Sequence, residues 1–147
     1  MRLTGKVVLV TGSTTGIGEG IARRFVAEGA QVILHGRNAE RGNALRQELG
    51  GGNAAFCRGD LGDAGYPDQL AKDAPAAFGR IDGLVNNAAG NFISPTENLT
   101  PGGFKAVTDI VLGGTFNFTL SAGKEMIQSK SGSILLSLIH ISEPTRR

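Results

Sequence analysis

A glycine-rich segment near the N-terminus has the residue types and spacing of a phosphate-binding loop. Gly12 permits a tight turn, Gly16 lets the backbone approach a pyrophosphate, and Gly18 lets a following helix pack closely. The free N–H groups and the positive dipole at the start of that helix attract phosphate. The segment therefore predicts a dinucleotide-binding loop, and the alternative is a purely structural turn. Its residues, in order, are Thr11, Gly12, Ser13, Thr14, Thr15, Gly16, Ile17 and Gly18.

The residues after the second apolar run indicate which dinucleotide is favoured. An Asp or Glu there would hydrogen-bond a ribose 2′-hydroxyl and favour NAD, whereas an arginine can pair with a 2′-phosphate. Residues 35–38 contain no acid and one arginine, Arg37. A guanidinium suits bidentate phosphate contact, so the sequence favours NADP (NADPH), with a solvated surface Arg37 as the alternative. His35 is expected to be a strand-end residue near the adenosine pocket, with no catalytic role.

An alternation of strands and helices must position these residues. Short β-branched and apolar runs predict strands buried on both faces, and the segments between them have helical spacing. This order indicates a doubly wound parallel α/β sheet, Rossmann-like, limited to five strands. Pro75 removes a backbone donor and should kink or end the third helix early. The predicted strands are 7–10, 31–34, 54–57, 81–86 and 133–138, and the predicted helices are 16–28, 39–49, 66–78 and 101 to about 129.

Composition excludes several classes of protein. The 147 residues fit one domain, and 40% hydrophobic content with 23 unevenly spaced glycines excludes both disorder and collagen. The net charge of +2, without blocks of like charge, gives no footprint for nucleic acid. The single Cys57 excludes an internal disulfide, and no segment approaches the ~20 apolar residues that span a bilayer. We therefore expect a cytoplasmic protein with no nucleic-acid partner, no membrane partner and no metal site.

Three motifs together resemble the short-chain dehydrogenase/reductase family over residues 5 to about 137. They are the glycine loop, Asp60-Leu61 and residues 86–90, which follow the first, third and fourth predicted strands as they do in that family. The resemblance implies that Asp60 binds the adenine ring, that Leu61 lies beside it, and that residues 86–90 support the cofactor and the central strand. The cofactor-binding residues expected are then Gly12, Ser13, Thr14, Thr15, Gly16, Ile17, Gly18, Arg37, Asp60, Leu61, Asn86, Asn87, Ala88 and Gly90.

A narrower likeness, from residue 86 to 118, is to the NADPH-dependent 2,4-dienoyl-CoA reductases. It implies a catalytic role for Asn91, which would help a tyrosine hold the thioester oxygen of an acyl-CoA substrate. It also implies that Phe92 lines the acyl-CoA site and that Thr100 touches substrate. Hydride addition to a dienoyl thioester creates an enolate, so neutral donors aimed at that oxygen lower the barrier. Val111 stands where most short-chain dehydrogenases have a catalytic asparagine, and the dienoyl-CoA reductases also lack it there.

Each of these substrate-site residues has a structural alternative. Asn91 can be a turn residue that bonds nearby backbone, Phe92 can belong to the core, and Thr100 is a helix cap in any case. Another short-chain reductase, acting on a ketone or a 3-oxoacyl substrate, is the alternative to the narrower likeness.

The family's catalytic tyrosine and lysine have no counterparts in this sequence. The only tyrosine is Tyr66, before the fourth predicted strand, and no lysine follows Lys130. Residues 138–147 match nothing in the family and resemble a translated sequencing-adapter peptide. We therefore expect residues 1–137 to be the NADP-binding Rossmann half of a homotetrameric reductase, and 138–147 to be a non-native tail. This chain would then be an inactive fragment, and the alternative is a non-catalytic NADP-binding module.

Overall fold

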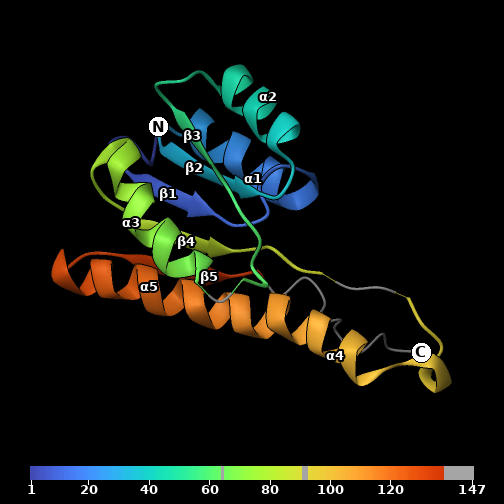
Figure 1. Ribbon diagram of the computed structural model, residues 1–147. Helices are drawn as coiled ribbons and strands as arrows, with labels where there is room; N and C mark the ends of the chain where they lie inside the picture. The colour runs from blue at the N-terminus through green and yellow to red at the C-terminus, as the bar shows by residue number, and fades with distance from the viewer. Residues whose placement is uncertain (64, 91–92, 138–147) are drawn as a thin grey trace, which may run out of the picture.

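The computed structural model describes residues 1–63, 65–90 and 93–137 (Figure 1). Asn91, Phe92 and the expected tail at 138–147 lie outside the described residues. Within the described part, no helix is both long and apolar enough to cross a membrane.

A five-stranded parallel sheet forms the centre of the molecule. Its strands run in the order β3-β2-β1-β4-β5, so β1 pairs with β2 on one side and with β4 on the other. The strand order therefore reverses at β1, and an open α/β sheet binds ligands at the carboxyl ends of the strands beside such a point. The predicted doubly wound parallel sheet is confirmed. The strands are β1 (Val7–Val10), β2 (Gln31–Gly36), β3 (Ala54–Arg58), β4 (Gly83–Asn86) and β5 (Ser133–Leu136).

Helices cover both faces of the sheet (Figure 1). Alternate residues of β1 point to opposite faces, as the period of a strand requires. Leu9 joins a core with Leu70 and Phe118 on the side of α3 and α5, whereas Val8 and Val10 join a core on the side of α1 and α2. The helices are α1 (Gly16–Ala27), α2 (Ala39–Leu49), α3 (Tyr66–Phe78), α4 (Pro101–Thr108) and α5 (Gly114–Gln128).

The helix expected from residue 101 to about 129 is present, but one segment within it departs from α geometry. A π-helical segment, η2 (Asp109–Gly113), connects α4 to α5, and a short 3₁₀ turn, η1 (Thr96–Asn98), precedes α4. Thr100 caps α4, because its Oγ1 accepts the N–H of Gly103 at 3.0 Å. The segments α4, η2 and α5 together form one long helical arm, residues 101–128, below the sheet in Figure 1.

The prediction that Pro75 ends the third helix early is wrong. The helix α3 continues through Pro75 to Phe78. A proline removes one intrahelical hydrogen bond, and here it stands only three residues before the helix ends. Leu70 of the same helix is buried in the core that contains Phe118, so tertiary packing holds the helix against the sheet.

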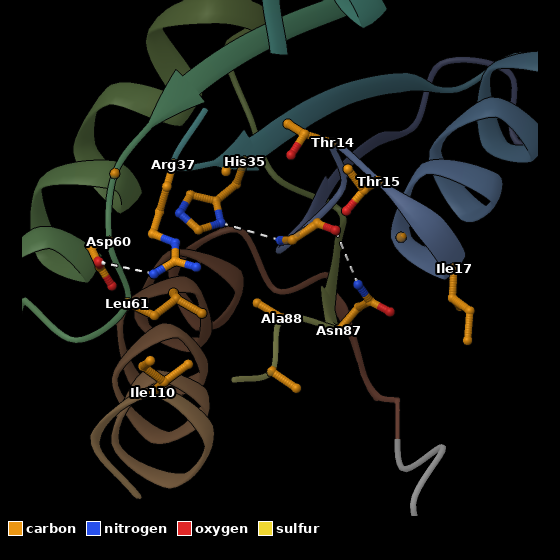
Figure 2. A pocket seen from close by; sticks show the side chains of 15 residues that line it. Thr14, Thr15, Ile17, His35, Arg37, Asp60, Leu61, Asn87, Ala88 and Ile110 are labelled. Atoms are coloured by element: carbon orange, nitrogen blue, oxygen red, sulfur yellow. Dashed lines mark hydrogen bonds and ion pairs between the residues drawn. The ribbon is translucent and has the colours of Figure 1, made fainter. Parts of the chain in front are cut away.

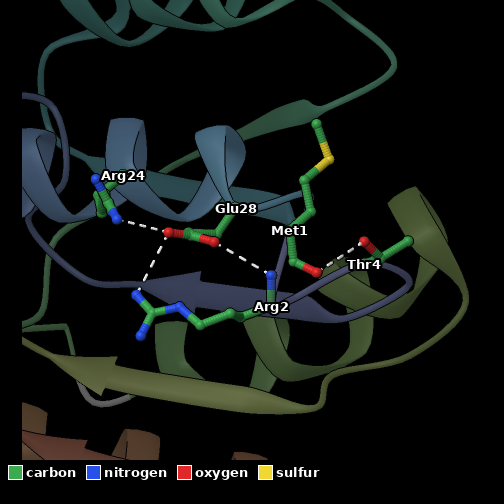
Figure 3. Close-up of polar contacts among 5 residues, drawn as sticks. All are labelled: Met1, Arg2, Thr4, Arg24 and Glu28. Atoms are coloured by element: carbon green, nitrogen blue, oxygen red, sulfur yellow. Dashed lines mark hydrogen bonds and ion pairs between the residues drawn. The ribbon is translucent and has the colours of Figure 1, made fainter.

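The N-terminal residues are attached to the end of α1 through Glu28 (Figure 3). The carboxylate accepts the N–H of Arg2 at 3.1 Å and guanidinium groups from Arg2 at 3.3 Å and Arg24 at 2.6 Å. The hydrogen bonds from Arg2 lower the pKa of Glu28, with its backbone N–H the largest contributor. Leu3 adds a backbone bond to the Glu28 carbonyl, so the chain enters β1 from a fixed direction.

Candidate functional site

A cleft of about 330 Å³ lies at the carboxyl ends of the central strands (Figure 2). Most residues that line it were predicted to bind a cofactor: Gly12, Thr14, Thr15, Ile17, Gly18, Arg37, Asp60, Leu61, Asn87 and Ala88. The remaining lining residues are His35, Gly36, Gly59, Ala89 and Ile110.

Two glycines of the loop have backbone conformations that other residues rarely adopt. Gly12 and Gly16 have φ values of +64° and +59°, in the left-handed region that glycine adopts without strain. A Cβ on Gly12 would lie 2.8 Å from the Cα of Ala88, and one on Gly18 would overlap the Gly12 carbonyl. Thr15 precedes α1, and its side chain makes no capping hydrogen bond. The first N–H groups of this helix are therefore not capped by that side chain and are available to a ligand in the cleft.

Asn87 and Thr11 fasten this loop to the end of β4. The Asn87 amide donates to the carbonyl oxygens of Thr11 and Gly12 at 3.1 and 3.3 Å. In return, the Thr11 hydroxyl accepts the N–H groups of Asn87 and Ala88, both at 3.0 Å. These four bonds hold two walls of the cleft at a fixed separation.

Arg37 and Asp60 stand on the rim of the cleft. Their charged groups lie 3.8 Å apart, and their side chains are 74% and 51% exposed. An exposed pair at this distance is weak, so the guanidinium is free to bind an anion. Asp60 also accepts the N–H of Gly62 at 2.9 Å, and Arg58 donates to the Arg37 carbonyl at 3.2 Å. Both rim residues are thus held by the turns that follow β2 and β3.

His35 lies on the floor of the cleft and is only 2% exposed. Its ring contacts those of Tyr66 and Phe118 at centroid distances of 5.5 and 5.7 Å, and these two rings lie 6.3 Å from each other. Burial lowers the pKa of His35 to about 4, opposed by the Gly59 backbone and the charge of Asp60. The imidazole is therefore neutral at pH 7.

Several lining residues were missed by sequence reasoning because no local motif marks them. Ile110 comes from the π-helical segment, and a Cβ on Gly90 would lie 3.0 Å from its Cδ1. Gly59 accommodates the ring of Tyr66, which a Cβ there would overlap. A Cβ on Gly36 would lie 2.6 Å from Thr14 Oγ1. The position of Gly59 directly before Asp60 was the one available sequence signal.

Some predicted residues do not line the cleft. Ser13 is fully buried beneath the loop, and Gly16 contributes a backbone turn with open space where a Cβ would be. Asn86 is buried and donates to Thr119 of α5 at 3.0 Å, so it joins the sheet to a helix. Thr100 is exposed and its hydroxyl is used as the α4 cap. The predictions for Asn91 and Phe92 fall outside the described residues.

Comparison with known proteins identifies relatives that are named as reductases and dehydrogenases. A 2,4-dienoyl-CoA reductase of Bacillus subtilis, designated "probable", is 38% identical over 90% of this chain and 53% of its own length. A similarly designated 2,4-dienoyl-CoA reductase 3 of Caenorhabditis elegans is 42% identical over 92% of this chain and 45% of its own length. A D-threitol dehydrogenase of Mycolicibacterium smegmatis is 39% identical over 91% and 52%. The chain thus spans about half the length of the curated relatives it matches.

A solved structure extends the comparison to three dimensions. A metagenomic short-chain oxidoreductase in complex with NADP superimposes with a TM-score of 0.85 at 33% identity, over 92% of this chain and 63% of that one. The sequence pattern named "short chain dehydrogenase" matches residues 6–137, which include every strand and the whole cleft. Fold, cleft and sequence agree, and the chain belongs to the short-chain dehydrogenase family.

Proposed function

We propose that this chain is the NADPH-binding half of an oxidoreductase that reduces an unsaturated acyl-CoA thioester of the 2,4-dienoyl type. The observation that carries the cofactor assignment is the cleft itself. It combines an exposed arginine with a glycine loop that packs too closely against Ala88 and Asn87 to admit side chains at Gly12 and Gly18, and β2 ends without an acid. The solved relative bound to NADP supports the same assignment.

The residues of the cleft fit the parts of this cofactor. The N–H groups at the start of α1 would bind the pyrophosphate, because Gly16 leaves open space where a side chain would otherwise stand. Asp60 and Leu61 would flank the adenine ring. Arg37, exposed at the rim, would pair with the 2′-phosphate. When bound, NADPH supplies the hydride for the reduction.

The dienoyl thioester is the favoured substrate class because relatives named as 2,4-dienoyl-CoA reductases match over nine-tenths of the chain. The dehydrogenase named for D-threitol matches at similar identity, so a ketone or 3-oxoacyl substrate is the second candidate. Asn91, Phe92 and Thr100 remain the residues proposed to contact substrate. Asn91 would then help hold the thioester oxygen on which negative charge develops.

Reduction by this mechanism also needs a proton donor for carbon. The family's tyrosine and lysine would supply and support it, and the 147 residues contain no counterpart of either. We therefore propose that the chain binds NADPH without turning over a dienoyl-CoA. A non-catalytic NADP-binding module predicts the same binding. The intact parent is proposed to be a homotetramer.

Calorimetric titration with NADPH and NADH tests the cofactor assignment. Wild type should bind NADPH about tenfold or more tightly than NADH, because one charge-assisted phosphate contact adds about that much. Arg37→Ala should lose this preference, whereas Arg46→Ala, an exposed arginine in the last turn of α2, should retain it. An equal preference in wild type and Arg37→Ala would contradict the assignment. Incubation with 2,4-hexadienoyl-CoA should consume no NADPH, and clear turnover would contradict the proposed inactivity.

A further inference from the structure

The first turn of the glycine loop is closed by a side chain of the neighbouring strand. The N–H of Gly12 donates to Nδ1 of His35 at 3.3 Å (Figure 2). Ser13 reinforces this link, since its N–H donates to the His35 carbonyl and its hydroxyl accepts the His35 N–H, both at 2.9 Å. Three hydrogen bonds therefore join the loop to the end of β2.

The tautomer of His35 follows from its bond to Gly12, because Nε2 is buried without a hydrogen-bond partner among the described residues. The ring contacts those of Tyr66 from α3 and Phe118 from α5, and the charge of Asp60, which follows β3, also acts on it. Burial raises the pKa of Tyr66, so that neighbour is uncharged as well. Because Nδ1 accepts the Gly12 N–H, the proton of the neutral ring must lie on Nε2.

The position of this bond gives it a consequence for ligand binding. Gly12 has a positive φ and forms the wall against Ala88, so its orientation sets the path of Thr14 and Thr15 toward α1. Without an acceptor, the Gly12 N–H would be left unpaired beneath the cleft, and the loop would relax to satisfy it. A phenylalanine in place of the histidine would keep a ring against Tyr66 and Phe118 without supplying that acceptor.

We propose that His35 is a positioning residue for the cofactor: its Nδ1 accepts the Gly12 N–H and holds the glycine loop in the conformation that binds pyrophosphate. The inference rests on the proposed nucleotide-binding function. It assigns His35 no contact with the reacting atoms. It predicts that the effect of losing His35 falls on ligands that carry a pyrophosphate, and not on those that reach only the Arg37 rim.

Nuclear magnetic resonance of the ¹⁵N-labelled chain tests the hydrogen bond without any ligand. An N–H···N bond transmits a scalar coupling between its two nitrogens. We expect such a coupling between the Gly12 amide and His35 Nδ1 at pH 7, together with a ring protonated on Nε2. A ring protonated on Nδ1, or the absence of the coupling, would overturn the proposal.

Binding by His35→Phe and His35→Asn tests the consequence. The asparagine can place an amide oxygen near the position of Nδ1, whereas phenylalanine cannot accept a hydrogen bond. His35→Phe should bind NADPH and ADP about tenfold more weakly than wild type, with adenosine 2′-phosphate unaffected, and His35→Asn should recover most of the loss. Thermal melting of both variants identifies any that fail to fold, and in that event the coupling measurement on wild type decides.

The outcomes separate this inference from the proposed function. If His35→Phe folds and binds NADPH and ADP like wild type, the positioning role is wrong and the cofactor assignment stands. If all three ligands weaken equally, His35 is merely structural, which also overturns the inference. If wild type binds neither NADPH nor ADP, the proposed function fails and the positioning role fails with it. Wild type that binds both but does not prefer NADPH to NADH contradicts only the role of Arg37.

Discussion

The strands β1 and β5 have similar sequences but opposite surroundings. Val7–Val10 pairs on both sides and is buried at all four positions, whereas Ser133–Leu136 pairs only with β4 in the described part of the chain and is exposed at all four. Leu9 is 1% exposed and Leu135 is 55% exposed. An apolar run therefore specifies a strand, but burial depends on the neighbouring strand and the covering helices.

The cleft is formed beside the buried strand β1 and not beside the exposed strand β5. Its walls come from the start of α1 and from the segments that follow β1, β2, β3 and β4, with one contact from the π-helical segment. By contrast, β5 and the helical arm expose apolar side chains in the described structure. Those of the arm include Phe104, Leu112, Phe116 and Ile127. All residues that line the cleft thus lie within the described part of the chain, even though the sheet edge at β5 is uncovered. The proposed nucleotide binding can therefore be measured separately from catalysis.

The largest effect is expected from adding a side chain to the glycine loop. Gly12→Val should abolish NADPH binding and lower the free energy of unfolding by about 3–4 kcal/mol, because a β-branched side chain is strained at positive φ and would press on Ala88. Titration calorimetry and urea unfolding measure the two effects. Gly20→Ala in α1 is the control, since a Cβ there meets open space and should stabilise by up to about 1 kcal/mol. If Gly12→Val still binds NADPH, the proposed role of the glycine loop in binding is wrong.

The comparison of the two strands is tested directly by a matched pair of truncations. Leu9→Ala should lower the free energy of unfolding by about 3 kcal/mol, since it leaves a cavity in the core shared with Phe118. Leu135→Ala removes an exposed side chain and should cost less than about 1 kcal/mol. Urea unfolding measures both. Equal losses would mean that β5 is covered in solution, for example by association of the chain.

A smaller loss of stability is expected from a change at the start of β1, the end of the strand away from the cleft. The buried carboxylate of Asp82 accepts the N–H of Val7 at 2.9 Å and pairs with Arg80 and Lys6. Asp82→Ala should cost about 2 kcal/mol, because the Val7 N–H loses its side-chain acceptor. The hydrogen bonds and the two cations hold the pKa of Asp82 below its ordinary value despite the opposing effect of burial.

The pH dependence of this contribution follows from the direction of the shift. A carboxyl with a lowered folded pKa is ionised in both states above its ordinary value of 3.8, where its stabilisation is fully present. Stability is then lost as the pH falls below 3.8 and through the lower folded pKa. The difference between wild type and Asp82→Ala should be constant from pH 5 to 7 and shrink toward pH 3. A difference that grows on acidification would contradict the assignment of the charge.

The smallest effect is expected at the N-terminal contact. Glu28→Gln removes the charge that Arg2 and Arg24 share but leaves an amide oxygen that can still accept the Arg2 N–H. The melting temperature should therefore fall slightly, and the affinity for NADPH should not change. Adding 0.5 M salt should narrow the difference, since exposed ion pairs are screened. A large loss of binding would show that this end of the chain influences the cleft.

Local patterns were sufficient to predict most of the sheet and the glycine loop. Strand β1 and helix α2 have the bounds predicted for them. The side chain of Asn38, for which no role as a cap was predicted, caps α2. The loop was recognisable because its glycines must follow one another closely along the chain. Pro75 misled the prediction, since the packing of α3 outweighs the single backbone donor that a proline removes.

The parts that could not be predicted depend on contacts between distant segments. The bond from Gly12 to His35 joins residues 23 positions apart, and it exists because β1 and β2 are adjacent in the sheet. Ile110 reaches the cleft from a π-helical segment that has no sequence signature. The hydrogen bond from Asn86 to Thr119 of α5 likewise joins segments far apart in the sequence. A strand's period indicates two faces, and only the assembled layers determine which helix covers each.

Mapping NADPH onto the amide spectrum of the 147-residue chain tests the central claim most directly. If the cleft binds the nucleotide, saturating NADPH should shift the amide signals of residues 12–18, 36–37, 59–61 and 87–89, and leave those of β5 unchanged. The signals of Gly36 and Arg37 should respond less to NADH than to NADPH. An unchanged spectrum, or shifts confined to β5 and the helical arm, would contradict the claim that this chain contains a working nucleotide site.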